Sequence, residues 1–154
     1  MAKSTFLTYA VALEAIQLLE SAIRDMHGDG STKRCDLHIV VLDPLSGEII
    51  CQYSIGKKAD WEHTYDQIAR DKATLAFKHK KDTSQIMNAE PHLLSEGDTV
   101  HAGGVYYKGI TIGVSGVESE FDEAIGRMIA ALIIGMVIHE YKKTRTNQDL
   151  NNIT

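Results

Sequence analysis

The densest apolar pattern of the chain lies between residues 119 and 141. Apolar side chains recur there at helical spacing in two neighbouring stripes, so residues 128–138 are apolar on nearly every face. Ser119 followed by Asp122 is typical of the capping box that begins a helix. We therefore predict a long helix from Ser119, buried partly in the core and partly against a second copy of the chain.

Two more helices and four strands are predicted from the same kind of pattern. The helical segments run from Thr5 or Thr8 to about Met26 and from about Asp60 to Lys78. The strand segments, which are continuously apolar or alternating, are residues 37–42, 48–54, 105–107 and 110–114.

Short turn sequences divide these strands into two predicted hairpins. Alternation in the second strand predicts that Ile49, Cys51 and Tyr53 share one face. Residues 83–95, which include Pro91, are predicted to be irregular. The expected order is therefore α-β-β-α-β-β-α, an α+β fold whose antiparallel sheet carries packed helices.

Composition and charge narrow the class of protein. The 154 residues, 44% of them apolar and 24% charged, are sufficient for one ordinary domain, which we place at residues 1–146 with a polar tail at 147–154. A net charge of −5 argues against nucleic acid or an anionic membrane as a partner. The N-terminal residues lack the pattern of a secretory signal, so we expect a cytoplasmic protein with Cys35 and Cys51 reduced.

Candidate chemistry is sparse. His38 lies within an apolar strand and is interpreted as a core histidine, whereas His101 precedes a glycine pair and is the better candidate for a metal or haem ligand. Glu120 and Glu123 have the spacing of an iron-binding pair, but acids in a first helical turn are favoured by the helix dipole alone. Ser115 lies between two glycines without the spacing of a nucleophile elbow.

Two segments carry a resemblance to a known family. Residues 102–126, AGGVYYKGITIGVSGVESEFDEAIG, and residues 68–77, IARDKATLAF, resemble the signatures of the GlcG/HbpS-like family. This family is also called DUF336 or the haem-degrading domain, and it includes the C-terminal domain of PduO-type proteins. The resemblance spans roughly residues 7–132. It implies a profilin-like fold and dimers that assemble further, often to octamers.

The resemblance also implies a ligand and the residues that would bind it. The ligand would be haem, a corrinoid or an anionic metabolite, in a protein that acts near glycerol, diol or glycolate metabolism. The implied binding residues lie in the two matching segments, with His101 as the candidate metal ligand; they are Arg70, Lys72, His101, Gly103, Gly104, Ser115 and Gly116. Because they lie two apart on one helix, Arg70 and Lys72 are expected to point in different directions, one toward the sheet.

The chain also departs from the family pattern at places near the expected pocket. Tyr106 replaces the proline of the glycine turn, residues 53–56 replace an R-x-D-G sequence, and the turn after the first strand holds one extra residue. No histidine occurs on the first predicted helix. Three hypotheses therefore stay open: a small-molecule-binding module, a non-catalytic assembly protein, and, with least support, a hydrolase or lyase that uses Asp43 or Ser115.

Overall fold

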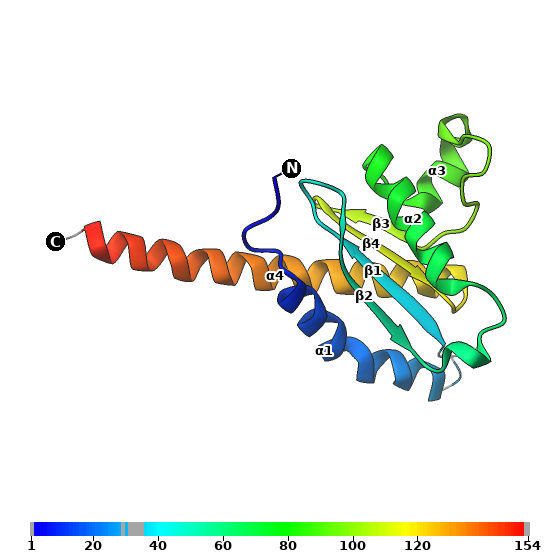
Figure 1. The fold of residues 1–154 in the computed structure, drawn as a ribbon, viewed down its shortest axis with the longest axis horizontal. Coiled ribbons are helices and arrows are strands. Elements are labelled where there is room, and N and C mark those ends of the chain that lie inside the picture. The colour runs from blue at the N-terminus through cyan, green and yellow to red at the C-terminus, as the bar shows by residue number, and fades with distance from the viewer. Residues whose placement is uncertain (1, 29, 31–35, 153–154) are drawn as a thin grey trace.

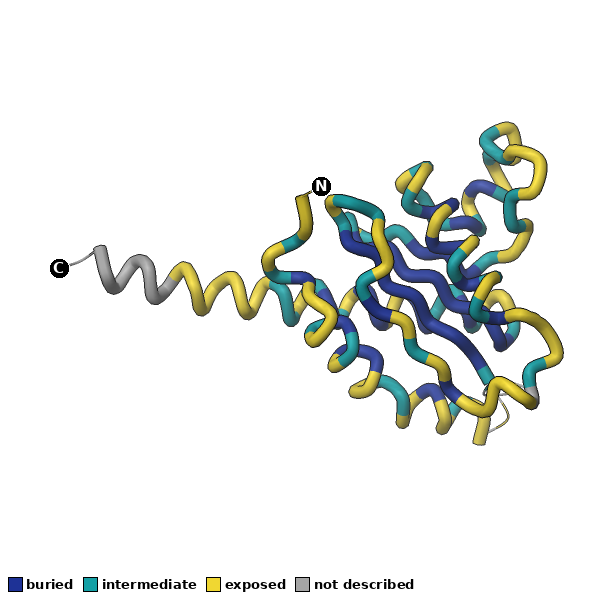
Figure 2. Tube along the Cα trace, in the orientation of Figure 1, coloured by how far each residue is buried: buried dark blue, intermediate teal, exposed yellow. Residues whose placement is uncertain are grey.

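The centre of the fold is a four-stranded antiparallel sheet with the strand order β2-β1-β4-β3. The computed structural model describes residues 2–28, 30 and 36–152, and Cys35 lies outside them. The strands are β1 (Leu37–Leu42), β2 (Ile49–Ile55), β3 (Gly104–Tyr107) and β4 (Ile110–Ser115). Every residue of the two central strands, β1 and β4, is buried, as a sheet covered on both faces requires (Figure 2).

Helices cover both faces of this sheet (Figure 1). The helices α1 (Tyr9–Gly28) and α4 (Ser119–Asn152) lie on one face, and α2 (Tyr65–His79) and α3 (Thr83–Ala89) lie on the other. Two short 3₁₀ helices, η1 (Lys58–Asp60) and η2 (Pro91–Leu93), complete the connections. No helix among the described residues is long and apolar enough to cross a membrane.

The larger core lies between the sheet and the helices α1 and α4. Ile112 and Val114 of β4 pack there with Ile125, Ile129 and other apolar side chains, all of them almost fully buried. A smaller cluster on the opposite face joins Val40 and Leu42 of β1 to alanines of α2. Small side chains on α2 let this helix lie close to the sheet.

Two glycines of the sheet make that close approach possible. Gly104 of β3 and Gly113 of β4 are directly paired across the two strands. A Cβ atom on Gly104 would lie 2.4 Å from the carbonyl oxygen of Lys72, and one on Gly113 would lie 2.1 Å from that of Ala69. Any larger residue would therefore collide with the backbone of α2.

The predicted fold class and element order are confirmed, and some details of the elements differ. The helix α2 begins at Tyr65 instead of about residue 60. Residues 83–95, predicted to be irregular, contain the short helix α3 and the 3₁₀ helix η2. The long helix begins at Ser119 as predicted and continues to Asn152, while the division of the chain at residue 146 stays a prediction.

The predicted alternation in the second strand is wrong at its first residue. The register of β1 and β2 shifts between Val41 and Leu42, which pair with Cys51 and Ile49, so that Ile50 forms a β-bulge. Ile49 consequently faces the α2 side with Leu42, whereas Cys51 packs into the larger core. A bulge adds one residue and reverses the faces that follow, which simple alternation cannot show.

Candidate functional site

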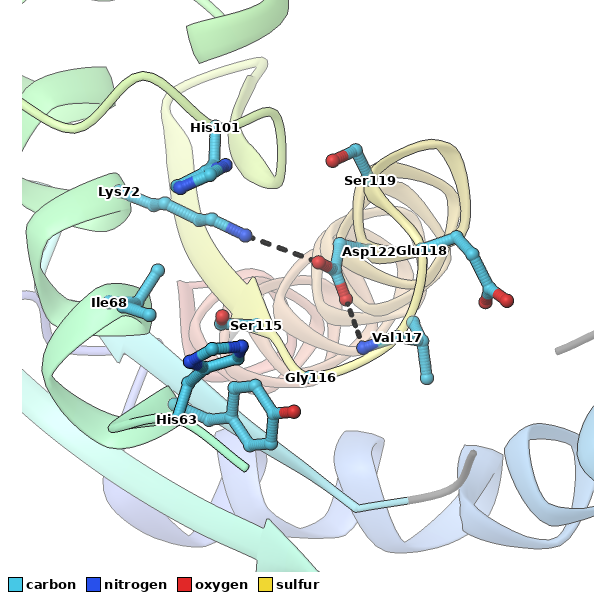
Figure 3. A pocket seen from close by; sticks show the side chains of 11 residues that line it. His63, Ile68, Lys72, His101, Ser115, Gly116, Val117, Glu118, Ser119 and Asp122 are labelled. Atoms are coloured by element: carbon cyan, nitrogen blue, oxygen red, sulfur yellow. Dashed lines mark hydrogen bonds and ion pairs between the residues drawn. The ribbon is translucent and has the colours of Figure 1, made fainter. Parts of the chain in front are cut away.

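A cavity of about 430 Å³ lies where α2, the end of β4 and the start of α4 meet (Figure 3). Its wall includes His63 and Tyr65 at the start of α2, Lys72 further along that helix, and His101 from the loop before β3. The opposite wall is made by residues 115–119, which join β4 to α4, and by Asp122. Ligand pockets commonly have volumes of about 300–1,000 Å³, so this cavity is large enough for a small molecule.

A buried ion pair lies in the wall of the cavity. The side chains of Lys72 and Asp122 are 2% and 4% exposed, and Lys72 Nζ lies 3.2 Å from Asp122 Oδ2. Lys72 Nζ also donates a hydrogen bond of 2.8 Å to the carbonyl oxygen of Val114. Burial lowers the pKa of Lys72, although the neighbouring Asp122 carboxylate acts in the opposite direction. The ammonium group is therefore held between the end of β4 and the first turn of α4, in the wall of the cavity.

Gly103 creates the space that this ammonium group occupies. A Cβ atom there would lie 2.9 Å from Lys72 Nζ and 2.5 Å from the carbonyl oxygen of Val114. The backbone of Gly103 has a φ of +122°, a conformation that favours glycine, and its carbonyl oxygen accepts a 2.9 Å hydrogen bond from the N–H of Val114. The glycine pair therefore has two separate roles, Gly103 beside Lys72 and Gly104 beneath α2.

Asp122 lies in the first turn of α4, as the sequence predicts, and its carboxylate also makes tertiary contacts. Its Oδ1 atom accepts a 3.1 Å hydrogen bond from the N–H of Val117, and its Oδ2 atom faces Lys72. The carbonyl oxygen of Glu118 accepts the N–H groups of Phe121 and Asp122 at 2.9 and 2.8 Å, which marks the start of the helix. The carboxylate therefore ties the first turn of α4 to α2 (Figure 3).

Two histidines contribute to the same cavity. His101 is exposed at the rim, and its carbonyl oxygen accepts a 3.0 Å hydrogen bond from Thr83 Oγ1, a fully buried hydroxyl that also accepts the N–H of Gly104. His63 reaches the cavity from the segment before α2. Among the described residues, no three His, Cys, Asp or Glu side chains gather closely enough to hold a metal ion.

The structure brings together most of the residues predicted for the site. Lys72, His101, Ser115 and Gly116 line the cavity. Arg70 does not: its guanidinium donates to Gln52 of β2 and to Gln67 of α2. Arg70 and Lys72 point in different directions, as expected, Arg70 toward β2 and Lys72 toward the end of β4.

Asp122, His63 and Tyr65 were missed by the sequence analysis. Whichever of Arg70 and Lys72 faces the sheet needs a buried counter-charge, and that requirement could have pointed to an acid near the strand ends. The positions of His63 and Tyr65 depend on how the loop before α2 returns to the sheet, and no local pattern shows this.

Ser115 and Asp43, the two residues considered for hydrolysis, do not lie close together. Ser115 pairs with His38 at the first end of β1, whereas Asp43 follows the last residue of that strand. Burial would raise the pKa of Asp43, but N–H groups of Ser4, Ser46 and Leu45 donate to its carboxylate and hold the pKa below its usual value. Asp43 therefore organises the β1–β2 turn.

The fold itself is similar to several solved structures, although no family model and no curated protein matches the sequence. A double mutant of HbpS from Streptomyces reticuli is 22% identical, with a TM-score of 0.59 over 86% of this chain and 90% of that one. The ORFY protein of Klebsiella pneumoniae, described as DUF336, is 19% identical, with a TM-score of 0.56 over 86% and 96%.

A third structure, described as a PduOC:heme complex, is 18% identical, with a TM-score of 0.53 over 79% of this chain and 91% of that one. These structures represent the same group of proteins that residues 68–77 and 102–126 resemble in sequence. The recognition made from the sequence is thus confirmed at the level of structure: the chain has the fold of HbpS, of a DUF336 protein and of PduOC.

Proposed function

We propose that this chain is a small-molecule-binding protein of the GlcG/HbpS-like family, and that its ligand occupies the cavity between α2 and α4. The observation that carries the proposal is the buried Lys72–Asp122 pair in the cavity wall, which places a cationic group beside an open space. An acidic group on the ligand would accept a charge-assisted hydrogen bond from that cation. The start of α4 at the same cavity adds the positive end of a long helix dipole.

Haem is the first candidate, and the residues present fit it. Haem iron takes an imidazole nitrogen as an axial ligand, and His101 and His63 both line the cavity. The acidic side groups of haem would need a cation, which Lys72 supplies. The PduOC structure of the same fold is described as a haem complex, which supports the choice of ligand but is a statement about that protein. A corrinoid or an anionic metabolite of glycerol, diol or glycolate metabolism is the alternative ligand.

Titration of the purified protein with hemin tests the haem form of the proposal. We expect a saturable shift of the Soret band, and we expect His101→Ala to abolish it while His139→Ala, which changes an exposed histidine of α4, leaves it intact. If His63→Ala abolished the shift and His101→Ala did not, haem would still be assigned to this cavity, with His63 as its iron ligand. Absence of any shift in the unmutated protein would exclude haem, and the same titration with cobalamin would then test the corrinoid.

We also propose that the chain forms homo-oligomers through α4. Four residues of this helix, at spacings of three and four, are exposed and share one face: Met128, Ala131, Gly135 and Ile138. Met128 and Ile138 are 37% and 47% exposed, and the small residues between them would let a second helix approach closely. This surface favours an assembling protein, and it is compatible with ligand binding because none of its four residues lines the cavity.

A further inference from the structure

A second cavity, of about 650 Å³, lies on the outer side of α2 and of the segment before it. Its walls include Lys58, Trp61, Asp66, Gln67 and Arg70, and it shares only His63 with the first cavity. Apart from His63, none of these residues has a role in the proposed haem site. The question is what chemistry this second space would recognise.

Trp61 supplies an aromatic surface and an unused donor. Its ring lies edge-on to His38 and tilted against Tyr65, with centroid distances of 6.1 and 5.5 Å, so two neighbours hold it in place. Its Nε1 atom is buried and has no hydrogen-bond acceptor within the described part of the chain. An indole N–H can only donate, and a buried donor without a partner carries a free-energy cost. Because this atom has almost no accessible surface, a ligand oxygen accepts the hydrogen bond only when the side chains that cover it move aside, and the bond then removes that cost.

The polar groups around Trp61 are mixed in charge. Arg70 donates to Gln52 Oε1 at 3.2 Å and to Gln67 Oε1 at 3.0 Å, which leaves further N–H groups of its guanidinium for a ligand. Lys58 Nζ lies 5.8 Å from the centre of the Trp61 ring and 3.2 Å from Asp66 Oδ2. The negative charges of Glu62 and Asp66 balance the positive charges of Lys58 and Arg70. The lining therefore favours a ligand for its hydrogen-bond acceptor atoms more than for its net charge.

We propose that this second cavity is a binding site for a planar ring that carries an acceptor oxygen, either a neutral carbonyl or a carboxylate. The ring would lie against Trp61, and the oxygen would accept the indole N–H, with the Arg70 guanidinium as its second donor. The two cavities share His63 in their walls, but their occupancy is read separately: hemin binding is read from the Soret band, and occupancy here is read from Trp61.

The chain contains one tryptophan, so a ¹⁵N-labelled sample has a single indole N–H signal that needs no assignment. Titration with benzamide and with benzoate should move this signal downfield in a saturable way, because its proton gains an acceptor. If the indole signal moves with benzoate alone, the site requires a carboxylate. If it moves with both probes, a neutral carbonyl oxygen is sufficient for binding. Failure of both probes, or an equal saturable shift with benzylamine, which has no acceptor oxygen, would overturn the proposal.

Two variants test the Arg70 and Trp61 donors separately. Calorimetry measures their affinity for whichever of benzamide and benzoate binds the unmutated protein more tightly. Arg70→Met should weaken its binding about tenfold, the effect of losing one hydrogen bond from a charged group. Arg24→Met is the matched control, because Arg24 also pairs with an acid four residues away but lies on α1. Trp61→Phe keeps a ring and removes the N–H, and it should weaken binding by several-fold. Unchanged affinity in both Arg70→Met and Trp61→Phe would rule out this site.

Discussion

At the scale of single residues, His38 shows how a buried polar side chain is satisfied in the sheet. It is 7% exposed, its Nδ1 lies 2.7 Å from Ser54 Oγ, and its Nε2 lies 3.0 Å from Gln52 Oε1. The interpretation as a core histidine is confirmed, with two hydrogen bonds. Burial lowers the pKa of His38 below 6.5, with smaller opposing effects from Gln52 and Asp66.

This pKa predicts a dependence of stability on pH. The unfolded chain binds a proton near pH 6.5, whereas the folded chain binds it only at lower pH. The free energy of unfolding should therefore be fully maintained above pH 6.5 and fall as the pH drops through the folded pKa, by at most about 1.4 kcal/mol per pH unit. Urea unfolding at a series of pH values measures this slope.

His38→Gln should remove that slope, although it lowers stability at every pH because it disturbs the hydrogen bonds of the sheet. His139→Gln, on the exposed end of α4, should retain the slope. An unchanged slope in His38→Gln would mean that another group titrates in this range. The pKa of Asp43 is also lowered, from its ordinary value of 3.8, so the protonation of Asp43 affects stability only at more acidic pH.

The residue scale also shows which site residues a sequence can reveal. Lys72 was named because residues 68–77 resemble the family signature, and helical spacing, a local property, added that Lys72 and Arg70 point in different directions. Asp122 was read as a capping residue because acids near a helix start are common for that reason alone. Its pairing with Lys72 depends on the position of α2 relative to α4, which is a property of the whole fold.

At the scale of elements, the contact between α2 and the sheet depends on Gly104 and Gly113. Gly113→Ala should destabilise the protein by about 1–3 kcal/mol, as overpacking does in other cores, because its methyl group would meet the carbonyl oxygen of Ala69. The change in the midpoint of urea unfolding measures this loss. The first cavity should change as well, since displacement of α2 moves Lys72.

Gly28→Ala is the matched control at the end of α1. A Cβ atom there meets nothing within 4 Å, and alanine is the better helix former, so stability should be unchanged or rise by up to about 1 kcal/mol. Equal stability of Gly113→Ala and the unmutated protein would show that α2 can move away from the sheet without cost.

The elements also show where pattern reasoning ends. The four strands and three long helices were predicted because each repeats its apolar pattern over enough residues. The helix α3 has seven residues, and only Thr83 and Ile86 are buried, so it has too little periodicity to detect. Asp82, which immediately precedes it, is held by tertiary contacts with the N–H of Tyr106 and with Arg127.

At the scale of the whole molecule, α4 continues beyond the sheet toward the C-terminus (Figure 1). Residues 128–138 were predicted to be apolar on all faces with a second subunit covering the remainder. Ile129 and Ile133 turn out to be fully buried in the chain's own core, so charged substitutions there would test folding and not association. The surface available for a partner is the exposed face formed by Met128, Ala131, Gly135 and Ile138.

The double change Met128→Glu and Ile138→Glu should convert an oligomer to a monomer that keeps its fold. Each apolar side chain buried in a contact contributes on the order of 1.5–3 kcal/mol, and two per subunit count twice in a symmetric dimer. Light scattering at micromolar concentration measures the mass. Val100→Glu, which changes a more exposed apolar residue in a loop, should leave the mass unchanged. A monomeric unmutated protein would refute the proposal.

The pairing of β1 with β4 has a consequence for the order of events during folding. Each hairpin, β1–β2 and β3–β4, joins neighbouring segments and can close quickly, whereas β1 and β4 come from residues 37–42 and 110–115. During synthesis the apolar strand β1 is finished long before its second partner exists. The nascent chain must therefore protect an open, hydrophobic strand edge until β4 arrives, and that interval is when it is most exposed to aggregation.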